Sequence, residues 1–110
     1  MPASDLERYG AYLTGEKHAS QNTVTSYLRD VKQFETYLQT DHHCTLREAD
    51  NAMVTEYMNG MLSRGKSAAS VTRYLASVKS FYNFLVSEQI LTVNPARGVA
   101  AAKVERRYPE

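Results

Sequence analysis

The sequence predicts an all-α fold, a compact bundle of four main helices. Apolar residues recur at steps of three and four along most of the chain, whereas the alternation typical of strands never extends beyond a few residues. The chain has 110 residues, of which 43% are hydrophobic. This length supports one domain with one core and leaves no room for two.

The first half of the chain predicts two helices. The first begins after Ser4, which forms a capping box with Glu7, and it ends near Gly15. The second covers residues 21–40 and is strongly amphipathic. Its apolar arc consists of Val24, Tyr27, Leu28, Val31, Phe34 and Leu38.

The second half predicts two more helices. Asp50 or Asn51 caps the third, and Ser67 or Ser70 begins the fourth, which runs from about residue 68 to residue 87. The fourth helix has the widest apolar stripe, so we expect it at the centre of the core. The stripe consists of Val71, Tyr74, Leu75, Val78, Phe81, Tyr82 and Leu85.

The end of the chain changes character. Asn94 and Pro95 form a cap followed by the residue favoured at a first helical position, which predicts a last short helix of alanine and valine. From Lys103 the sequence has no periodicity and is typical of a linker. We therefore expect a helical domain over residues 1–102 and the start of a linker over residues 103–110.

Several classes of protein are disfavoured by composition. No apolar run approaches the roughly 18 residues of a membrane span, and residues 1–12 lack the layout of a signal peptide. The single cysteine, Cys44, cannot form an internal disulfide, which agrees with a reducing compartment. We expect a cytoplasmic protein with no membrane partner.

The charge is unevenly distributed although the net charge is only +1. Residues 1–59 contain five Lys/Arg and nine Asp/Glu, a net −4, whereas residues 60–110 contain eight and three, a net +5. No acid lies between Glu56 and Glu88. This distribution favours one basic face.

Enzyme motifs are absent from the sequence. It contains no P-loop, GxGxxG, GxSxG or HExxH, and Asp30, Glu35 and Glu56 fall at solvated or flanking helix positions. We therefore expect no catalytic residue, no cofactor and no small-molecule substrate in this chain. The one cluster with metal-ligand chemistry consists of His42, His43 and Cys44. Three adjacent ligands do not easily face one zinc ion, so the cluster is interpreted as a polar turn, and a zinc module remains an alternative.

The polar faces of the second and fourth helices are suited to DNA. Both mix cations with short polar residues, the mixture that a helix in a major groove needs for phosphates and base edges. A solvated helix surface is the alternative, because the isoelectric point of 7.9 is below the value above 9 typical of basic DNA readers. Projected at 100° per residue, the polar face of the second helix consists of Thr25, Arg29, Lys32 and Thr36, with Ser26 and Gln33 beside them. That of the fourth helix consists of Thr72, Arg73, Ala76, Ser80 and Asn83, with Ser77 and Lys79 at its margins.

An ordered series of motifs resembles a known family. It comprises Asn22-Thr23-Val24 with Tyr27 and Phe34, then Ser70-Val71 with Leu75, Val78, Lys79, Ser80, Phe81, Tyr82, Phe84 and Leu85, then Asn94-Pro95-Ala96. This series, spread from Leu6 to Pro109, resembles the N-terminal core-binding domain of the tyrosine recombinases, the phage integrase family.

The resemblance implies a SAM-like core-binding domain that clasps one side of a recombination site in double-stranded DNA. It places the second and fourth helices in the major groove. It also implies that the tyrosine nucleophile belongs to a separate C-terminal catalytic domain, so Tyr108 is not the nucleophile. A monomer is expected for this chain, and a tetramer on paired sites for the full-length protein. The implied DNA contacts are Thr25, Ser26, Arg29, Lys32, Lys66, Ser70, Thr72, Arg73, Ser77, Lys79 and Ser80.

A helical protein–protein interaction module is the alternative function. DNA binding through phosphates weakens as salt rises, whereas binding through an apolar groove is insensitive to salt. The DNA hypothesis also predicts that Arg29→Ala and Arg73→Ala weaken duplex binding and leave the domain folded.

Overall fold

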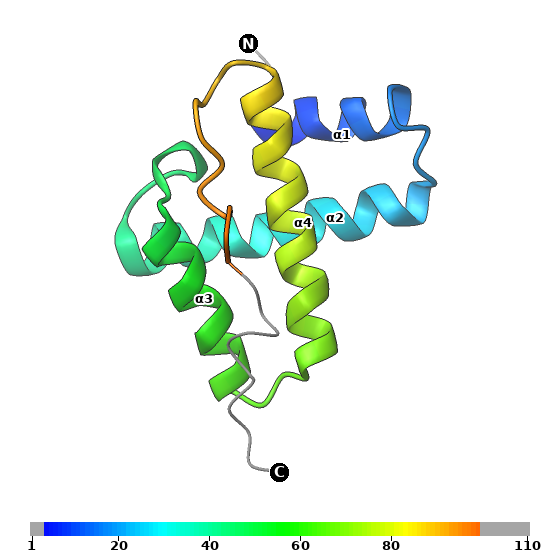
Figure 1. The fold of residues 1–110 in the computed structure, drawn as a ribbon. Helices are drawn as coiled ribbons and strands as arrows, with labels where there is room; N and C mark the ends of the chain where they lie inside the picture. The colour runs from blue at the N-terminus through cyan, green and yellow to red at the C-terminus, as the bar shows by residue number, and fades with distance from the viewer. Residues whose placement is uncertain (1–3, 100–110) are drawn as a thin grey trace.

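The computed structural model describes residues 4–99, and within this range every regular element is helical (Figure 1). The all-α prediction is confirmed. None of the described helices is long and apolar enough to cross a membrane. The elements are α1 (Asp5–Gly15), α2 (Gln21–Tyr37), the π-helical turn η1 (Leu38–His42), the 3₁₀ turn η2 (Leu46–Glu48), α3 (Asn51–Ser63) and α4 (Ala68–Ser87).

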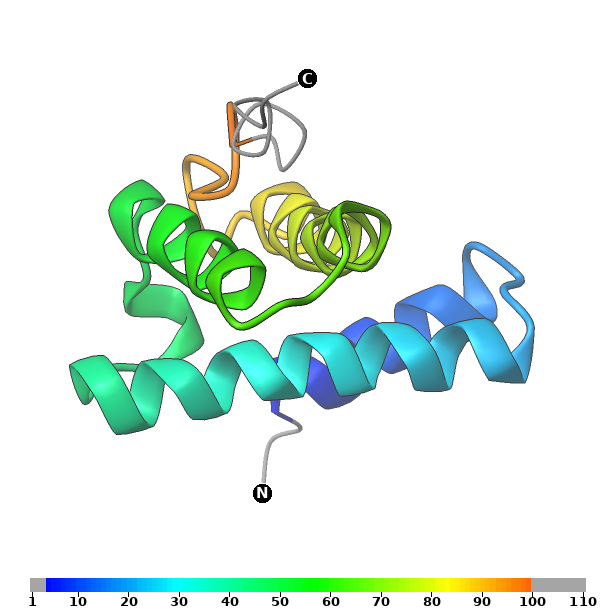
Figure 2. The same cartoon turned by 90° about the horizontal axis from the view of Figure 1, so that it is seen from below.

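The four α-helices form two layers. Helices α1 and α2 lie side by side in one layer, and α3 and α4 form the other (Figure 2). Helix α4 crosses α2, as both views show (Figures 1 and 2). A Cβ atom at Gly10 would lie 3.2 Å from the Cδ1 atom of Leu28, so the glycine permits the close approach of α1 to α2.

Each α-helix begins at a side-chain cap that satisfies a free backbone N–H. Ser4 and Glu7 form the expected capping box. Asp50, rather than Asn51, caps α3, and Ser67, rather than Ser70, caps α4. The cap of α2 is Ser20, whose hydroxyl accepts a hydrogen bond from the N–H of Thr23.

The second helix ends earlier than the expected residue 40. Regular α-helix stops at Tyr37, and the chain continues as η1 until His43, whose φ of 53° is left-handed. The N–H groups of His43 and Cys44 both donate to the carbonyl of Leu38. The wider turn places the ring of His42 2.9 Å from the carboxylate of Glu56 in α3, a contact that the apolar pattern does not encode.

The expected helix after Pro95 is wrong for the described residues, which form turns up to Val99. Two physical reasons are visible. The side chain of Asn51 donates to the carbonyls of Pro95 and Arg97, and Gly98 adopts a φ of +84°. Residues 100–110, which include the expected linker and Tyr108, lie outside the described residues.

Large aromatic side chains fill the space between the layers. Tyr9, Phe34, Phe81 and Tyr82 are fully buried, and the last three belong to the apolar arcs that the sequence predicts. The two buried phenols each have a hydrogen-bond acceptor: Tyr9 donates to the Oγ atom of Ser80 at 2.7 Å, and Tyr82 donates to the carbonyl of Leu46 at 2.6 Å. These bonds join α4 to α1 and to η2.

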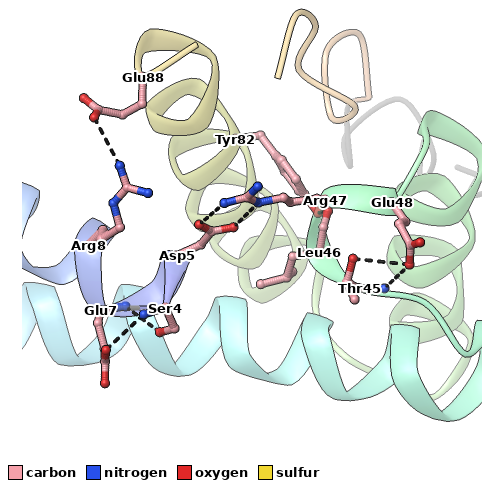
Figure 3. A network of polar contacts seen from close by, with 10 residues as sticks. All are labelled: Ser4, Asp5, Glu7, Arg8, Thr45, Leu46, Arg47, Glu48, Tyr82 and Glu88. Carbon is pink, nitrogen blue, oxygen red and sulfur yellow. Dashed lines mark hydrogen bonds and ion pairs between the residues drawn. The ribbon is translucent and has the colours of Figure 1, made fainter. Parts of the chain in front are cut away.

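A polar network joins the first helix to the rest of the molecule (Figure 3). Arg47 of η2 makes a bidentate ion pair with Asp5, at 2.8 and 2.9 Å. About one turn further along α1, Arg8 lies 3.7 Å from Glu88, at the end of α4. The hydrogen bonds from Arg47 lower the pKa of Asp5.

Candidate nucleic-acid interface

The crossing of α2 and α4 contains a buried carboxylate. Asp30 is 1% exposed, and its Oδ2 atom accepts a hydrogen bond from the Ser77 hydroxyl at 2.8 Å. Its Oδ1 atom makes no hydrogen bond in the described structure and lies 3.5 Å from the Nη2 atom of Arg73. A buried charge is costly without a partner, so Ser77 and Arg73 together make this burial possible.

Two expectations are corrected by this geometry. Asp30 is not solvated, because it lies at the edge of the apolar arc formed by Val31 and Phe34 and faces α4. Ser77 is fully buried, so its hydroxyl bonds Asp30 and is not available to DNA. One signal in the sequence points to this arrangement: at 100° per residue, Asp30 projects only about 40° from Phe34 on the wheel of α2.

Arg73 is positioned from two sides. Its guanidinium lies beside the carboxylate of Asp30, and its Cζ atom lies 4.7 Å from the centroid of the Tyr74 ring. The side chain is nevertheless 47% exposed. Because a guanidinium has five N–H donors in a planar fork, contacts with Asp30 and Tyr74 leave donors available on the exposed side.

The polar stripe of α2 begins next to this crossing. Ser26 lies one turn before Asp30 and is partly buried, and Arg29 is the residue immediately before it and is exposed. Thr25 and Lys32 are also exposed, and Lys32 lies 3.8 Å from Glu35 in a surface ion pair. A pair of this kind contributes little to stability, so Lys32 can exchange partners at little cost.

The expected residues of α4 and its leading loop are divided between surface and interior. Lys66 and Thr72 are exposed, and Lys66 follows Gly65, whose φ of +95° turns the chain between α3 and α4. Ser70 is partly buried, and its N–H donates to the cap Ser67. Its hydroxyl accepts a hydrogen bond from the Ser67 hydroxyl at 3.1 Å.

Lys79 and Ser80 are less accessible than most of the residues expected to contact DNA. Both are partly buried, and the hydroxyl of Ser80 accepts the hydrogen bond from Tyr9. The backbone carbonyl of Lys79 accepts a hydrogen bond from Asn94. Ser80 therefore has a structural partner that the sequence pattern did not indicate.

The cluster of His42, His43 and Cys44 is dispersed in the structure. The Nε2 atom of His42 lies 2.9 Å from Glu56 and 3.1 Å from the hydroxyl of Tyr37. The thiol of Cys44 lies 3.8 Å from the sulfur of Met53, and His43 is exposed. Within residues 4–99, no group of three metal-ligating side chains is brought together.

A groove lies on a different part of the surface, between the residues leading into α3 and the segment 91–97. Its volume is about 470 Å³, and Arg47 and Arg97 contribute to its lining. Val93, which also lines it, is 60% exposed. The groove contains none of the residues expected to contact DNA.

Comparisons with known proteins agree with the architecture. The model of the phage integrase N-terminal SAM-like domain matches residues 6–89. A tyrosine recombinase XerC of Myxococcus xanthus is 38% identical over 105 residues, which are 96% of this chain and 35% of that protein. A tyrosine recombinase XerD of Staphylococcus aureus is 27% identical over 106 residues, 96% of this chain and 36% of that protein.

The chain spans about a third of the length of these curated relatives. No solved structure matches it significantly. The family model covers more than half of the chain, from the first turn of α1 to just beyond the end of α4. The chain therefore belongs to the phage integrase family of tyrosine recombinases, and residues 6–89 are its N-terminal SAM-like domain.

Proposed function

We propose that this domain binds double-stranded DNA by placing α2 and α4 in the major groove. The observation that carries the proposal is the half-exposed side chain of Arg73 at the crossing of these two helices, next to the polar stripe of α2. The absence of any acid between Glu56 and Glu88 supports it, because DNA is a polyanion. The relatives are named as tyrosine recombinases, which supports the proposal.

The proposed contacts differ in what they recognise. Lys32 and Lys66 are exposed ammonium groups suited to phosphates. Arg29 and Arg73 are the proposed base readers, because a guanidinium bonds the guanine edge in a bidentate manner. The supporting polar contacts are Thr25, Ser26, Ser70, Thr72, Lys79 and Ser80, and Ser77 is omitted because it is buried.

For the whole protein, we propose site-specific DNA recombination, with strand cleavage carried out outside this domain. Residues 1–102 then form the DNA-binding domain, and residues 103–110 begin the linker to a catalytic domain. The chain alone is proposed to be a monomer, and the full-length protein a tetramer on two paired sites. Incubation of the chain with supercoiled DNA tests whether strand cleavage takes place outside this domain. The chain should leave the DNA uncut.

An amide chemical-shift titration tests the binding proposal. The labelled chain is titrated with a duplex of arbitrary sequence at about 50 mM and about 200 mM salt, a range over which phosphate contacts weaken strongly. Shifts should cluster on residues 25–32 and 66–80 and fade at the higher salt. If five to eight phosphates are neutralised, the slope of log K against log salt is roughly −4 to −7.

Other outcomes of the titration are equally informative. Shifts that cluster around Val93 and persist at about 200 mM salt would contradict the proposed face, because apolar contact is insensitive to salt. The absence of any shift at about 50 mM salt would also contradict the proposed DNA-binding face. The same titration of Arg8→Gln is the control, because Arg8 pairs with Glu88 at the end of α4 that is remote from Lys66. This variant should show the same cluster of shifts as the wild type.

A further inference from the structure

We propose that Asp30 is a positioning residue for Arg73, and that the buried carboxylate makes Arg73 a reader of base sequence rather than a mobile phosphate contact. The proposal rests on the proposed DNA-binding function and deepens it. It starts from a buried acid directly beneath the proposed DNA-binding residues, which is unexpected because a carboxylate near a DNA surface opposes binding.

The carboxylate itself has a fixed orientation. Asp30 is 1% exposed, and the Ser77 hydroxyl holds its Oδ2 atom at 2.8 Å. Ser77 is fully buried on the neighbouring helix and also lies 3.3 Å from the carbonyl of Arg73, one turn earlier. Because both side chains are enclosed, the Oδ1 atom has a defined place at the crossing.

Arg73 is the cation that compensates this charge. Among the described residues, the Nη2 atom of Arg73 is the one basic nitrogen within 4 Å of Asp30, and it faces the oxygen that has no hydrogen bond. An uncompensated buried carboxylate is strongly unfavourable, so the fold itself favours the conformer in which Arg73 reaches back to the crossing. The centroid of the Tyr74 ring lies 4.7 Å from the Cζ atom of Arg73 and restricts the motion of the guanidinium from a second side.

This arrangement lowers the entropic cost of recognition. A free arginine side chain loses rotamer freedom when it binds, and a pre-oriented one has already lost it on folding. A guanidinium with a fixed plane accepts only a partner with matching geometry, which suits the two acceptors of a guanine edge. A mobile guanidinium would bind any phosphate with little discrimination.

The test uses Asp30→Asn in the 110-residue chain. Asparagine keeps the size of the side chain and an oxygen that accepts from Ser77, but it presents no charge to Arg73. The matched control is Asp41→Asn, which makes the same chemical change at an exposed position of η1. Circular dichroism and thermal melts establish that both variants are folded.

Two binding measurements separate specificity from affinity. Selection from a pool of randomised DNA duplexes gives the base preference of each variant, and titration with one arbitrary duplex gives the non-specific affinity. We expect Asp30→Asn to lose roughly 5- to 150-fold of discrimination at the base position that Arg73 reads, the range carried by one bidentate arginine. Its non-specific affinity should be unchanged or higher, because the variant has one negative charge fewer.

A third measurement follows Arg73 directly. The side-chain Nε–H group of Arg73 should give an ordered nitrogen relaxation signature in the wild-type chain and a mobile one in Asp30→Asn. A purely structural role of Asp30 would not change this signal in a folded variant. Arg73→Lys provides a second variant, because lysine keeps the charge beside Asp30 and lacks the planar fork, and it should lose the same base preference.

The outcomes distinguish this proposal from the proposed function. A wild-type chain that fails to bind DNA at about 50 mM salt overturns both. In a second outcome, the wild-type chain binds DNA, and Asp30→Asn has the same base preference and the same Arg73 mobility as Asp41→Asn. This outcome overturns the positioning role and leaves DNA binding intact. A wild-type chain that binds without any base preference likewise overturns the positioning role alone.

Discussion

The phenol of Tyr82 donates a hydrogen bond to the backbone carbonyl of Leu46 at 2.6 Å, between two residues 36 positions apart in the chain. Tyr82 is fully buried in α4, and Leu46 belongs to η2, which precedes α3. The bond fixes the irregular connection between the two layers, where regular backbone hydrogen bonding is interrupted. Burial raises the pKa of the Tyr82 phenol well above its usual range, which keeps the donor protonated.

Removal of this one hydroxyl should destabilise the domain measurably. Tyr82→Phe leaves the carbonyl of Leu46 with only a long contact, at 3.4 Å, from the N–H of Ala49, and we expect a loss of about 1–2 kcal/mol in the free energy of unfolding. Tyr82→Ala also creates a cavity and should cost about 3–5 kcal/mol. Urea denaturation gives both values. Equal stabilities of Tyr82→Phe and the wild type would show that the hydrogen bond contributes nothing.

Acid should weaken the link between α1 and η2. The hydrogen bonds from Arg47 lower the pKa of Asp5, so the folded state binds fewer protons at this site than the unfolded state. The contribution is therefore fully present above pH of about 4, the ordinary aspartate value, and is lost as the pH falls through the lowered pKa. Asp5→Asn should cost about 0.5–1 kcal/mol at neutral pH and little at pH of about 2.

Urea denaturation at the two pH values checks this prediction. Asp41→Asn is the matched control, since Asp41 is exposed and the change in charge is the same. The Arg47–Asp5 pair would be energetically irrelevant if Asp5→Asn and Asp41→Asn had the same pH dependence. Glu56, whose pKa is lowered by the hydrogen bond from Tyr37, adds to the acid dependence of every variant.

Alkali should destabilise the domain through its buried phenols. Burial raises the pKa of Tyr9 to about 12 and that of Tyr57 to about 12. A raised phenol pKa contributes stability that is present below the unfolded value of about 10 and is lost as the pH rises through the folded value. The stability contributed by these two phenols should therefore fall as the pH rises above about 10.

The alkaline prediction is checked by urea denaturation across this pH range together with the absorbance of phenolate. Tyr57→Phe removes one titrating group without opening a cavity, so the fall above pH of about 10 should be shallower in this variant. A slope identical to that of the wild type would mean that Tyr57 does not contribute. Tyr27→Phe, at a partly buried position, serves for comparison.

Arg29 offers a cleaner test of DNA binding than Arg73. Arg73 compensates the buried Asp30, so Arg73→Ala should destabilise the domain as well as weaken binding. Arg29 is exposed, and Arg29→Gln should leave stability within about 0.5 kcal/mol. Because Arg29 is a proposed base reader, the variant should bind its preferred duplex less tightly and lose about 1–3 kcal/mol of discrimination at one base pair.

The control for Arg29→Gln is Arg8→Gln, which has the same change in charge. Arg8 lies near Glu88, and the 20 residues of α4 separate that end from Lys66 by about 30 Å. Fluorescence anisotropy with a labelled duplex at several salt concentrations measures both variants. Equal losses for the two variants would indicate a general effect of net charge and not a localised face.

The helices were predictable because each is specified locally. Caps such as Ser4 and Asp50 and the arcs of apolar residues act within one or two turns, so the sequence shows them directly. The irregular connections were not predictable in this way. The π-helical turn is accompanied by the contact between His42 and Glu56, and the turns after Pro95 by the hydrogen bond from Asn51. Both contacts join parts of the chain that are distant in sequence.

In the candidate site, too, the locally specified features were predictable and the contacts between helices were not. A helical wheel identified Arg29, Lys32 and Arg73 as polar and exposed, which the structure agrees with. The wheel placed Ser77 at the margin of that face and Asp30 outside the core, because a wheel contains no neighbouring helix. Only the crossing of α2 and α4 determines which margin is covered, and that crossing is a tertiary property.

The two-layer arrangement also bears on how quickly the domain forms. Helices α1 and α2 are neighbours in sequence and in space, and so are α3 and α4, so each pair assembles over a short loop (Figure 2). The crossing of α4 over α2 contributes the most extensive contact between the two layers, and the bond from Tyr9 to Ser80 adds a second link, between α1 and α4. Helical domains built largely from such local contacts fold in microseconds to milliseconds. A newly synthesised copy would thus spend little time with its apolar arcs exposed to other chains.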